Sequence, residues 1–305
     1  KKRHFKTGSI VIPAGIQTAT NWRELLAKMS LENNISIANL TTGFTSQGID
    51  LGSGSLVPLT PVKVLLIGGK GVSQYEAGEI LYYLNETLHI PVSVIEHQRL
   101  HNIDLSNYTH IILVDGDYEN IPSKTSIKLE TWANQGGVLF GQKRAAKWLS
   151  KQGILKAEFA TKSQINQLFD TDGLNYKERE GLAARKRIAG AIFNTIIDTG
   201  HPLAYGYSNN TLPLFRNSTL IMEYPSLPFI TVAKYTPLPL LSGYTDRNLV
   251  NRIANNAAII GHNVKKGRVV ASSDNLVFRG YWHGSAKLLA NTLFFAKAFN
   301  TPVSN

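Results

Sequence analysis

The sequence predicts an α/β protein built on a mostly parallel sheet with helices on both faces. Two observations predict this class. Short apolar runs alternate with helical patterns between residues 62 and 140, and turns rich in glycine or aspartate follow several of the runs. Apolar runs of this kind are typical of parallel strands, which are buried on both faces. Right-handed crossovers between them would place helices on both sides of the sheet.

The first half of the predicted sheet follows directly from these patterns. We expect strands at 62–67, 92–95, 110–114 and 137–140, and helices at 74–88 and 123–133 with Ser123 as the cap of the second. A glycine-rich loop, 68–71, follows the first strand. The third strand ends at the turn Asp115-Gly116-Asp117.

The second half is interrupted by a polar, mostly helical insertion at about 155–187. Further strands are expected at 188–194, 229–233, 257–260 and 268–272, and an apolar helix at 284–299. Proline keeps the runs 212–215 and 237–240 extended. We assign residues 61–305 to one domain containing this insertion.

Residues 1–60 are predicted to form a separate small α/β unit or arm. Ser9 to Pro13 and Ile35 to Leu40 have the pattern of strands. Asn21 to Met29 has the pattern of a helix, with Asn21 and Glu24 spaced as in a capping box. Thr41 to Ser55 is rich in Thr, Gly and Ser and is expected to be a loop.

Composition excludes several classes of protein. The 305 residues are 43% hydrophobic, which is enough for a full core, and contain no cysteine. Disulfides, thiolate zinc sites and cysteine nucleophiles are therefore excluded. No apolar run is long enough to span a membrane, and the first residues lack the apolar stretch of a secretory signal. We expect no transmembrane segment, and these features leave the compartment open.

The net charge of +11 is concentrated in one segment. Residues 143–187 hold eleven Lys and Arg against five acidic residues, more than half of the whole excess. This segment lacks a nucleic-acid-binding motif and the aromatic spacing of a base-stacking surface. We interpret it as a solvated helical face, which makes nucleic acid an improbable partner.

The stretch from Gly136 to Leu149 predicts a buried strand followed at once by a helix. Enzymes with a nucleophile elbow hold a reactive Ser or Cys at such a turn, beside free backbone N–H groups. Here Gln142 is expected at that position, and a neutral amide cannot attack a carbonyl. The alternative is an ordinary junction between strand and helix. Both interpretations predict no catalytic residue.

Residues that follow neighbouring strands should share one crevice at the carboxyl edge of the sheet. Gly69 and Lys70 resemble a phosphate-binding loop, although a tight turn explains them as well. Asp115 and Asp117 could hold a hard cation or act as an acid and base pair, or could simply cap their turn.

The segment from Asp274 to Gly284 is polar, aromatic and cationic at once. Arg279 could hold an anion or a sugar, and His283 could act as a base, or the segment could be a structural clamp. None of the eight histidines has the spacing of a zinc peptidase site, so no metal ligand is expected. The complete set of candidate ligand-binding residues is Gly69, Lys70, Asp115, Asp117, Gln142, Lys143, Arg144, Arg279 and His283.

Many short stretches between Ser9 and Phe299 resemble the region that follows the catalytic domain in large bacterial zinc carboxypeptidases of the carboxypeptidase A type. That region is similar to class I glutamine amidotransferases, which have a flavodoxin-like sheet. The stretches that carry the resemblance are 51–53, 57–59, 61–66, 71–72, 76–79, 104–106, 108–110, 136–139, 201–206, 240–244, 266–269 and 278–280.

The resemblance implies a non-catalytic accessory domain for scaffolding, positioning or binding. The amidotransferase cysteine would be replaced by Gln142, and the zinc ligands of the peptidase match no position here. It also implies an upstream carboxypeptidase domain in the same chain that carries zinc, and a periplasmic or extracellular location. No cofactor is expected in these 305 residues. The alternative is a binding or hydrolytic module for a carbohydrate or an acidic peptide, with Lys143, Arg144 and Arg279 as anion anchors.

Overall fold

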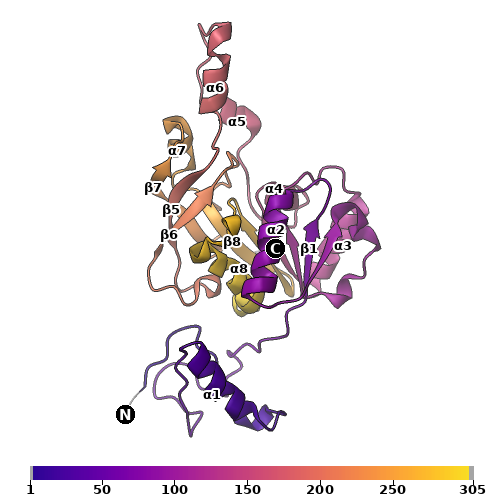
Figure 1. The fold of residues 1–305 in the computed structure, drawn as a ribbon, viewed down its shortest axis with the longest axis vertical. Coiled ribbons are helices and arrows are strands. Elements are labelled where there is room, and N and C mark those ends of the chain that lie inside the picture. Colours follow the sequence, from indigo (N-terminus) through magenta and orange to yellow (C-terminus); the bar gives the residue numbers. More distant parts are fainter. Residues whose placement is uncertain (1–2, 302–305) are drawn as a thin grey trace. The chain divides into compact units, whose positions relative to one another are not determined.

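The computed structural model describes residues 3–301 and divides the chain into two compact units, 1–58 and 59–305 (Figure 1). Each unit is described by itself. No helix in the described residues is long and apolar enough to cross a bilayer.

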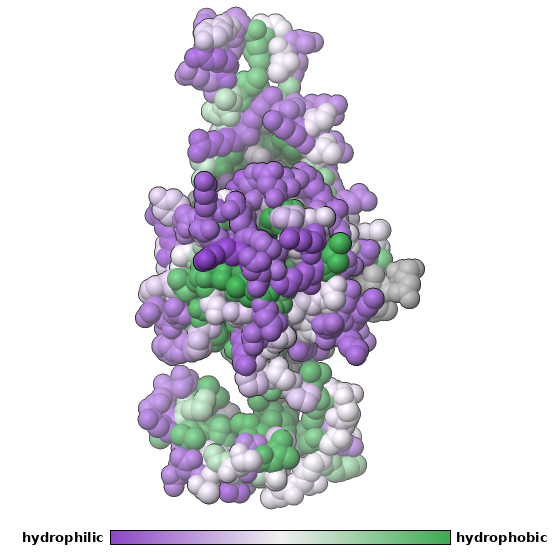
Figure 2. All heavy atoms as spheres, turned by 90° about the vertical axis from the view of Figure 1, so that its right-hand side faces the viewer, coloured by the Kyte–Doolittle hydropathy of each residue, from purple (hydrophilic) through white to green (hydrophobic). Residues whose placement is uncertain are grey.

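The N-terminal unit contains helix α1 (Trp22–Glu32) and a short 3-10 turn (Ala14–Ile16). The strands expected at Ser9 to Pro13 and Ile35 to Leu40 are wrong, because both segments are irregular. Their isoleucines are about half exposed, and a single strand without a paired neighbour is not stable. Asn21 precedes α1, although its side chain makes no cap hydrogen bond. Apolar side chains lie on the surface of this unit (Figure 2).

The larger unit is built on one nine-stranded sheet within the described residues, in the order β2-β1-β3-β4-β9-β8-β7-β5-β6. The strands are β1 (Val64–Gly68), β2 (Val92–Glu96), β3 (His110–Leu113), β4 (Val138–Gln142), β5 (Ala191–Ile197), β6 (Thr211–Arg216), β7 (Thr231–Gly243), β8 (Ala257–Val264) and β9 (Gly267–Ser272).

The helices of this unit are α2 (Gln74–Tyr82), α3 (Ser123–Asn134), α4 (Arg144–Lys151), α5 (Lys162–Asn166), α6 (Arg179–Arg185), α7 (Arg247–Ile253) and α8 (His283–Phe295). Helices α2 and α3 lie on opposite sides of the parallel strands (Figure 1). Helices α5 and α6 form the polar insertion and extend away from the sheet (Figure 1).

The flavodoxin-like α/β class is confirmed. Strands β2, β1, β3, β4 and β9 run parallel and form the core of the sheet. Strands β8, β7, β5 and β6 extend it in antiparallel pairs. The sequence patterns predicted no strand at β6, because Pro213 lies within it. Proline is tolerated there because β6 is the edge strand.

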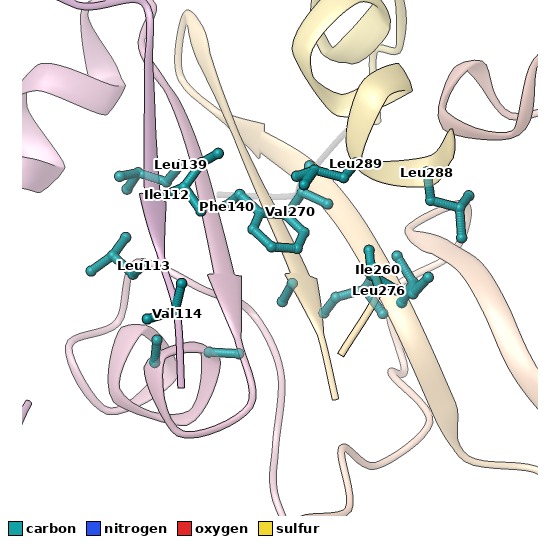
Figure 3. Packing of buried hydrophobic residues seen from close by; sticks show 14 of the residues in the cluster. Ile112, Leu113, Val114, Leu139, Phe140, Ile260, Val270, Leu276, Leu288 and Leu289 are labelled. Atoms are coloured by element: carbon teal, nitrogen blue, oxygen red, sulfur yellow. The ribbon is translucent and has the colours of Figure 1, made fainter. Parts of the chain in front are cut away.

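Apolar side chains from the middle of the sheet pack against α8 (Figure 3). Phe140 of β4 and Val270 of β9 lie close to Leu289 of α8 in this view. All three side chains are at most 2% exposed. The apolar run of α8, which the sequence predicted as a closing helix, therefore covers the centre of the sheet where parallel and antiparallel strands meet.

Leu289→Ala should lower the free energy of unfolding by about 2–5 kcal/mol, because it leaves a cavity in this core. Thermal and denaturant unfolding measure the change. Leu238→Ala is the matched control, since Leu238 is 85% exposed and its truncation should cost less than about 0.5 kcal/mol. Equal losses for the two variants would contradict the packing described.

Four histidines are buried within this unit, namely His97, His110, His201 and His262. Burial lowers the pKa of His110 to about 4 and the pKa of His201 to about 4, from an ordinary 6.5, because the charged imidazole is poorly solvated inside the protein. His110 Nδ1 lies 2.8 Å from Thr109 Oγ1. Both rings are therefore neutral in the folded protein near neutral pH.

These histidines should make the protein less stable in mild acid. The unfolded chain binds protons as the pH falls through about 6.5, whereas the folded chain does so only near pH 4. Stability is thus retained above pH 6.5 and lost between 6.5 and 4, by about 3 kcal/mol for each ring. Urea titrations at several pH values measure the slope. His110→Gln should flatten it, and an unchanged slope would count against this role of His110.

Candidate functional site

The turn after β4 has the backbone geometry of an elbow, and Lys143 occupies it. Lys143 has φ 52° and ψ −115°, a conformation rare for a residue with a side chain. The placement of Gln142 at the turn was wrong. Gln142 is the last residue of β4, where it is paired with Ser272 of β9, and it is fully buried. Pairing with β9 lengthens the strand beyond its apolar run and shifts the turn by one residue.

The Lys143 side chain is held inside the protein rather than presented to solvent. It is 3% exposed, and its ammonium donates hydrogen bonds to Glu76 of α2 and to Asn217 Oδ1. Gln142 Nε2 donates to the other oxygen of the same carboxylate, at 2.5 Å. Burial raises the pKa of Glu76, and the nearby Lys143 charge opposes that rise. The elbow side chain is therefore fixed in a buried ion pair.

The backbone N–H groups of the elbow are also occupied. Lys143 N donates to Ser272 O at 2.7 Å, and Arg144 N donates to Asp115 Oδ1 at 3.2 Å. In nucleophile-elbow enzymes the second of these groups stabilises the oxyanion. Here a carboxylate stands in that place and would repel a developing negative charge. The elbow therefore lacks both an exposed nucleophile and a free oxyanion donor.

Asp115 and Arg144 form the second ion pair of the site. Arg144 Nε and Nη2 donate to the two oxygens of Asp115 at 2.7 and 3.1 Å. This hydrogen bonding raises the pKa of Arg144. The Asp115 carboxylate also lies at the N-terminus of α4, where a negative charge is favourable. Asp115 is thus committed to fixing the start of α4.

The loops that follow β1 and β3 are held together by their backbones. Val72 and Gly116 form a bridge, and Asp117 N donates to Gly71 O at 2.8 Å. Gly69 has a positive φ, its carbonyl accepts from the Gln74 amide, and the neighbouring Lys70 is exposed. These contacts make the glycine-rich loop a tight turn.

The two aspartates of the β3 loop have separate partners. Asp117 Oδ1 accepts from Glu119 N at 3.0 Å in an Asx turn, whereas Asp115 binds Arg144. Within residues 3–301, no group of three or more His, Asp or Glu side chains could hold a metal ion.

Arg279 lies in the segment between β9 and α8, and His283 begins α8. Arg279 has φ 52°, is exposed, and its backbone N–H donates to Glu79 Oε1 at 2.8 Å. Its guanidinium lies over the Phe278 ring, 5.2 Å from the centroid. His283 is the exposed first residue of α8. Lys143 and Arg144 are each paired with a carboxylate, whereas the Arg279 side chain is exposed, so the three predicted anion anchors differ in their surroundings.

The sequence patterns missed two of the elbow's partners. Glu76 follows Ser73 with the spacing of a capping box, and Ser73 does accept a hydrogen bond from Glu76 N at 3.3 Å. The Glu76 side chain, however, bonds to Gln142 and Lys143, and no sequence signal linked it to them. Asn217 lies directly after β6, a strand the patterns did not predict, and no sequence signal pointed to it.

A second buried cluster lies beside the elbow and was also missed. Arg216 and Asp274 are both fully buried and form an ion pair with Nη1 and Oδ1 2.9 Å apart. Tyr235 OH accepts from the same guanidinium at 2.6 Å and donates to Asp274. Burial raises the pKa of Asp274, while Arg216 opposes the rise. The cluster ties β6 and β7 to the segment after β9.

A cavity of about 630 Å³ opens beside α4. It is bounded by the loop after β3, by α4, by the polar insertion and by the segment that follows β6. Basic side chains predominate among its polar lining residues. The cavity is separate from the buried Glu76–Lys143 pair, because neither of these residues lines it.

Comparison with known proteins bears on the fold alone. No family model matches the sequence, and no curated protein does. A solved structure described as a ThuA-like protein from Parabacteroides merdae matches with a TM-score of 0.52 and 13% identity, over 81% of this chain and 93% of that one. The fold is amidotransferase-like.

A glutamine amidotransferase from Thermotoga maritima matches less closely, with a TM-score of 0.42 and 11% identity, over 71% of this chain and 76% of that one. These comparisons do not show a carboxypeptidase parent, which stays a prediction. The amidotransferase-like domain thus combines an elbow backbone with a lysine that is locked inside.

Glu76→Gln should lower the free energy of unfolding by about 3–5 kcal/mol, because it leaves the Lys143 ammonium buried without a countercharge. Adding Lys143→Met should recover much of that loss, since the unpaired charge is then removed as well. A double-mutant cycle monitored by urea unfolding measures the coupling. Strictly additive losses would contradict the ion pair.

Proposed function

We propose that this amidotransferase-like domain is a non-catalytic binding or positioning module. The main support comes from the elbow. Lys143 is buried there against Glu76, and the Arg144 N–H donates to the Asp115 carboxylate. Acyl transfer at an elbow needs an exposed nucleophile and donors for the oxyanion. Both requirements are unmet at the same turn.

A lysine can itself act as a nucleophile, but only as a neutral amine. The Lys143 ammonium instead donates hydrogen bonds to the Glu76 carboxylate and to Asn217 Oδ1. Its burial at 3% exposure also keeps a substrate carbonyl away from the amine. Covalent chemistry by Lys143 is therefore disfavoured by its hydrogen bonds and by its burial.

The finer proposal is that the domain is an accessory part of an exported zinc carboxypeptidase. Its support is the sequence resemblance between Ser9 and Phe299. In this proposal the zinc and its ligands belong to an upstream peptidase domain, and the protein works in the periplasm or outside the cell. The coding sequence upstream of Lys1 tests it. A His-x-x-Glu motif with a later histidine would support the parent, and a reading frame without them would contradict it.

The alternative proposal is a module that binds a carbohydrate or an acidic peptide. The cavity beside α4 favours binding in general, because its volume falls in the range of small-molecule sites. The hydrolytic form of this alternative is disfavoured by the blocked elbow.

The purified protein should release neither ammonia from glutamine nor amino acids from peptides. Coupled glutamate dehydrogenase and ninhydrin assays measure the two products. Lys143→Met and Asp115→Asn are the informative variants, since each changes the elbow. Turnover that both substitutions abolish would overturn the non-catalytic proposal.

A further inference from the structure

The cavity beside α4 is assembled from segments far apart in the sequence. Gly116 to Glu119 follow β3, residues 144–151 belong to α4, residues 160–166 and 186 come from the insertion, and Ser218 to Leu220 follow β6. The insertion is therefore more than a solvated excursion from the sheet, because it supplies one wall of an open cavity.

The charge of the lining is one-sided. Five basic residues line the cavity against two acidic ones, Asp117 and Glu119. Lys151 is paired with Glu119, and Arg144 with Asp115. The five basic residues are Arg144, Lys147, Lys151, Lys162 and Lys186.

Three of these lysines are uncompensated by acidic groups. Lys186 Nζ makes only a long contact, 3.4 Å, with the neutral amide of Asn166. Lys147 and Lys162 make no side-chain hydrogen bond or ion pair with the part of the chain that the structure describes. Cations gathered around one concave space repel one another, and a bound anion would relieve that repulsion.

Apolar side chains accompany the cations. Trp148, Ala160, Ile165 and Leu220 also line the cavity. Trp148 is buried and packs against Tyr118, with ring centroids 5.5 Å apart, so this part of the wall is rigid. A ligand that fits would carry an uncharged body as well as its charges.

We propose that this cavity binds a small organic molecule with at least two negative charges, carried by phosphate or carboxylate groups. Lysine ammonium groups act as point charges that suit either group. All five basic lining residues come from residues 143–187, so the site accounts for five of the eleven Lys and Arg of that segment. This inference rests on the proposed non-catalytic function, because it assumes that the domain binds the molecule without converting it.

Isothermal titration calorimetry of the whole protein tests the site, with glucose 6-phosphate and citrate as the phosphate and carboxylate probes. Glucose and inorganic phosphate are the controls for the uncharged body and for charge alone. We expect at least one organic anion to bind about tenfold or more tightly than either control, and to weaken as NaCl rises from about 50 to about 500 mM. Binding of neither anion would overturn the proposal, as would equal affinity for inorganic phosphate.

Lys147→Gln with Lys162→Gln should weaken anion binding about tenfold or more, because it removes two uncompensated charges. Lys124→Gln is the matched control, since Lys124 is exposed on α3 and does not line the cavity. Equal weakening by control and test variants would refute the site. Tight, salt-sensitive binding of a single-stranded oligonucleotide that citrate does not displace would also refute it, in favour of a nucleic-acid surface.

The two proposals fail in different ways. An absence of anion binding leaves the non-catalytic elbow untouched. Chemical conversion of a bound probe, detected by mass spectrometry, would overturn the non-catalytic proposal even if the probe binds in the cavity.

Discussion

The buried ion pair between Glu76 and Lys143 is the constraint on which the site depends. It joins the first turn of α2 to the turn between β4 and α4, two segments that are adjacent in space because β1 and β4 both flank β3. Such a pair adds little net stability compared with apolar residues, because both groups lose their hydration. Its effect is geometric. Neither side chain can leave without exposing the other as an unpaired buried charge, so the elbow lysine remains inward. The Asp115–Arg144 pair then fixes the start of α4 beside it.

The sequence predicted those elements of the fold that depend on local residues, and it missed elements that depend on distant segments. Strands β1 and β3 were found because each contains a continuous apolar run, Leu65 to Ile67 and Ile111 to Leu113, and such runs need no knowledge of their neighbours. Alternation at Ile10 and Ile12 suggested a strand by the same local criterion. This prediction was wrong because a strand also requires a paired neighbour, and a local pattern does not show whether one is present. Strand β6 was missed for the opposite reason, since Pro213 is a poor strand residue that an edge position tolerates.

The candidate site was predicted in outline and wrong in detail. The carboxyl ends of β1, β3 and β4 do bring Gly71, Asp117, Asp115 and Arg144 together, which follows from strand order alone. The identity of the elbow residue depended on where β4 ends, and this is decided by pairing with Ser272, about 130 residues away. Glu76 could not be recognised as the partner of Lys143, because the two residues are 67 positions apart and no local pattern links them. Long-range charge pairing has no local signature.

Edge strand β6 also bears on how this protein behaves at high concentration. A strand at the open margin of a sheet can recruit a strand from another chain and so begin aggregation. Pro213 has no N–H to offer, and its carbonyl already accepts a hydrogen bond from the Trp282 indole at 3.3 Å. Both backbone hydrogen-bonding positions of this residue are therefore closed to an incoming chain. The same proline thus blocks pairing with an incoming strand at one position of the β6 edge.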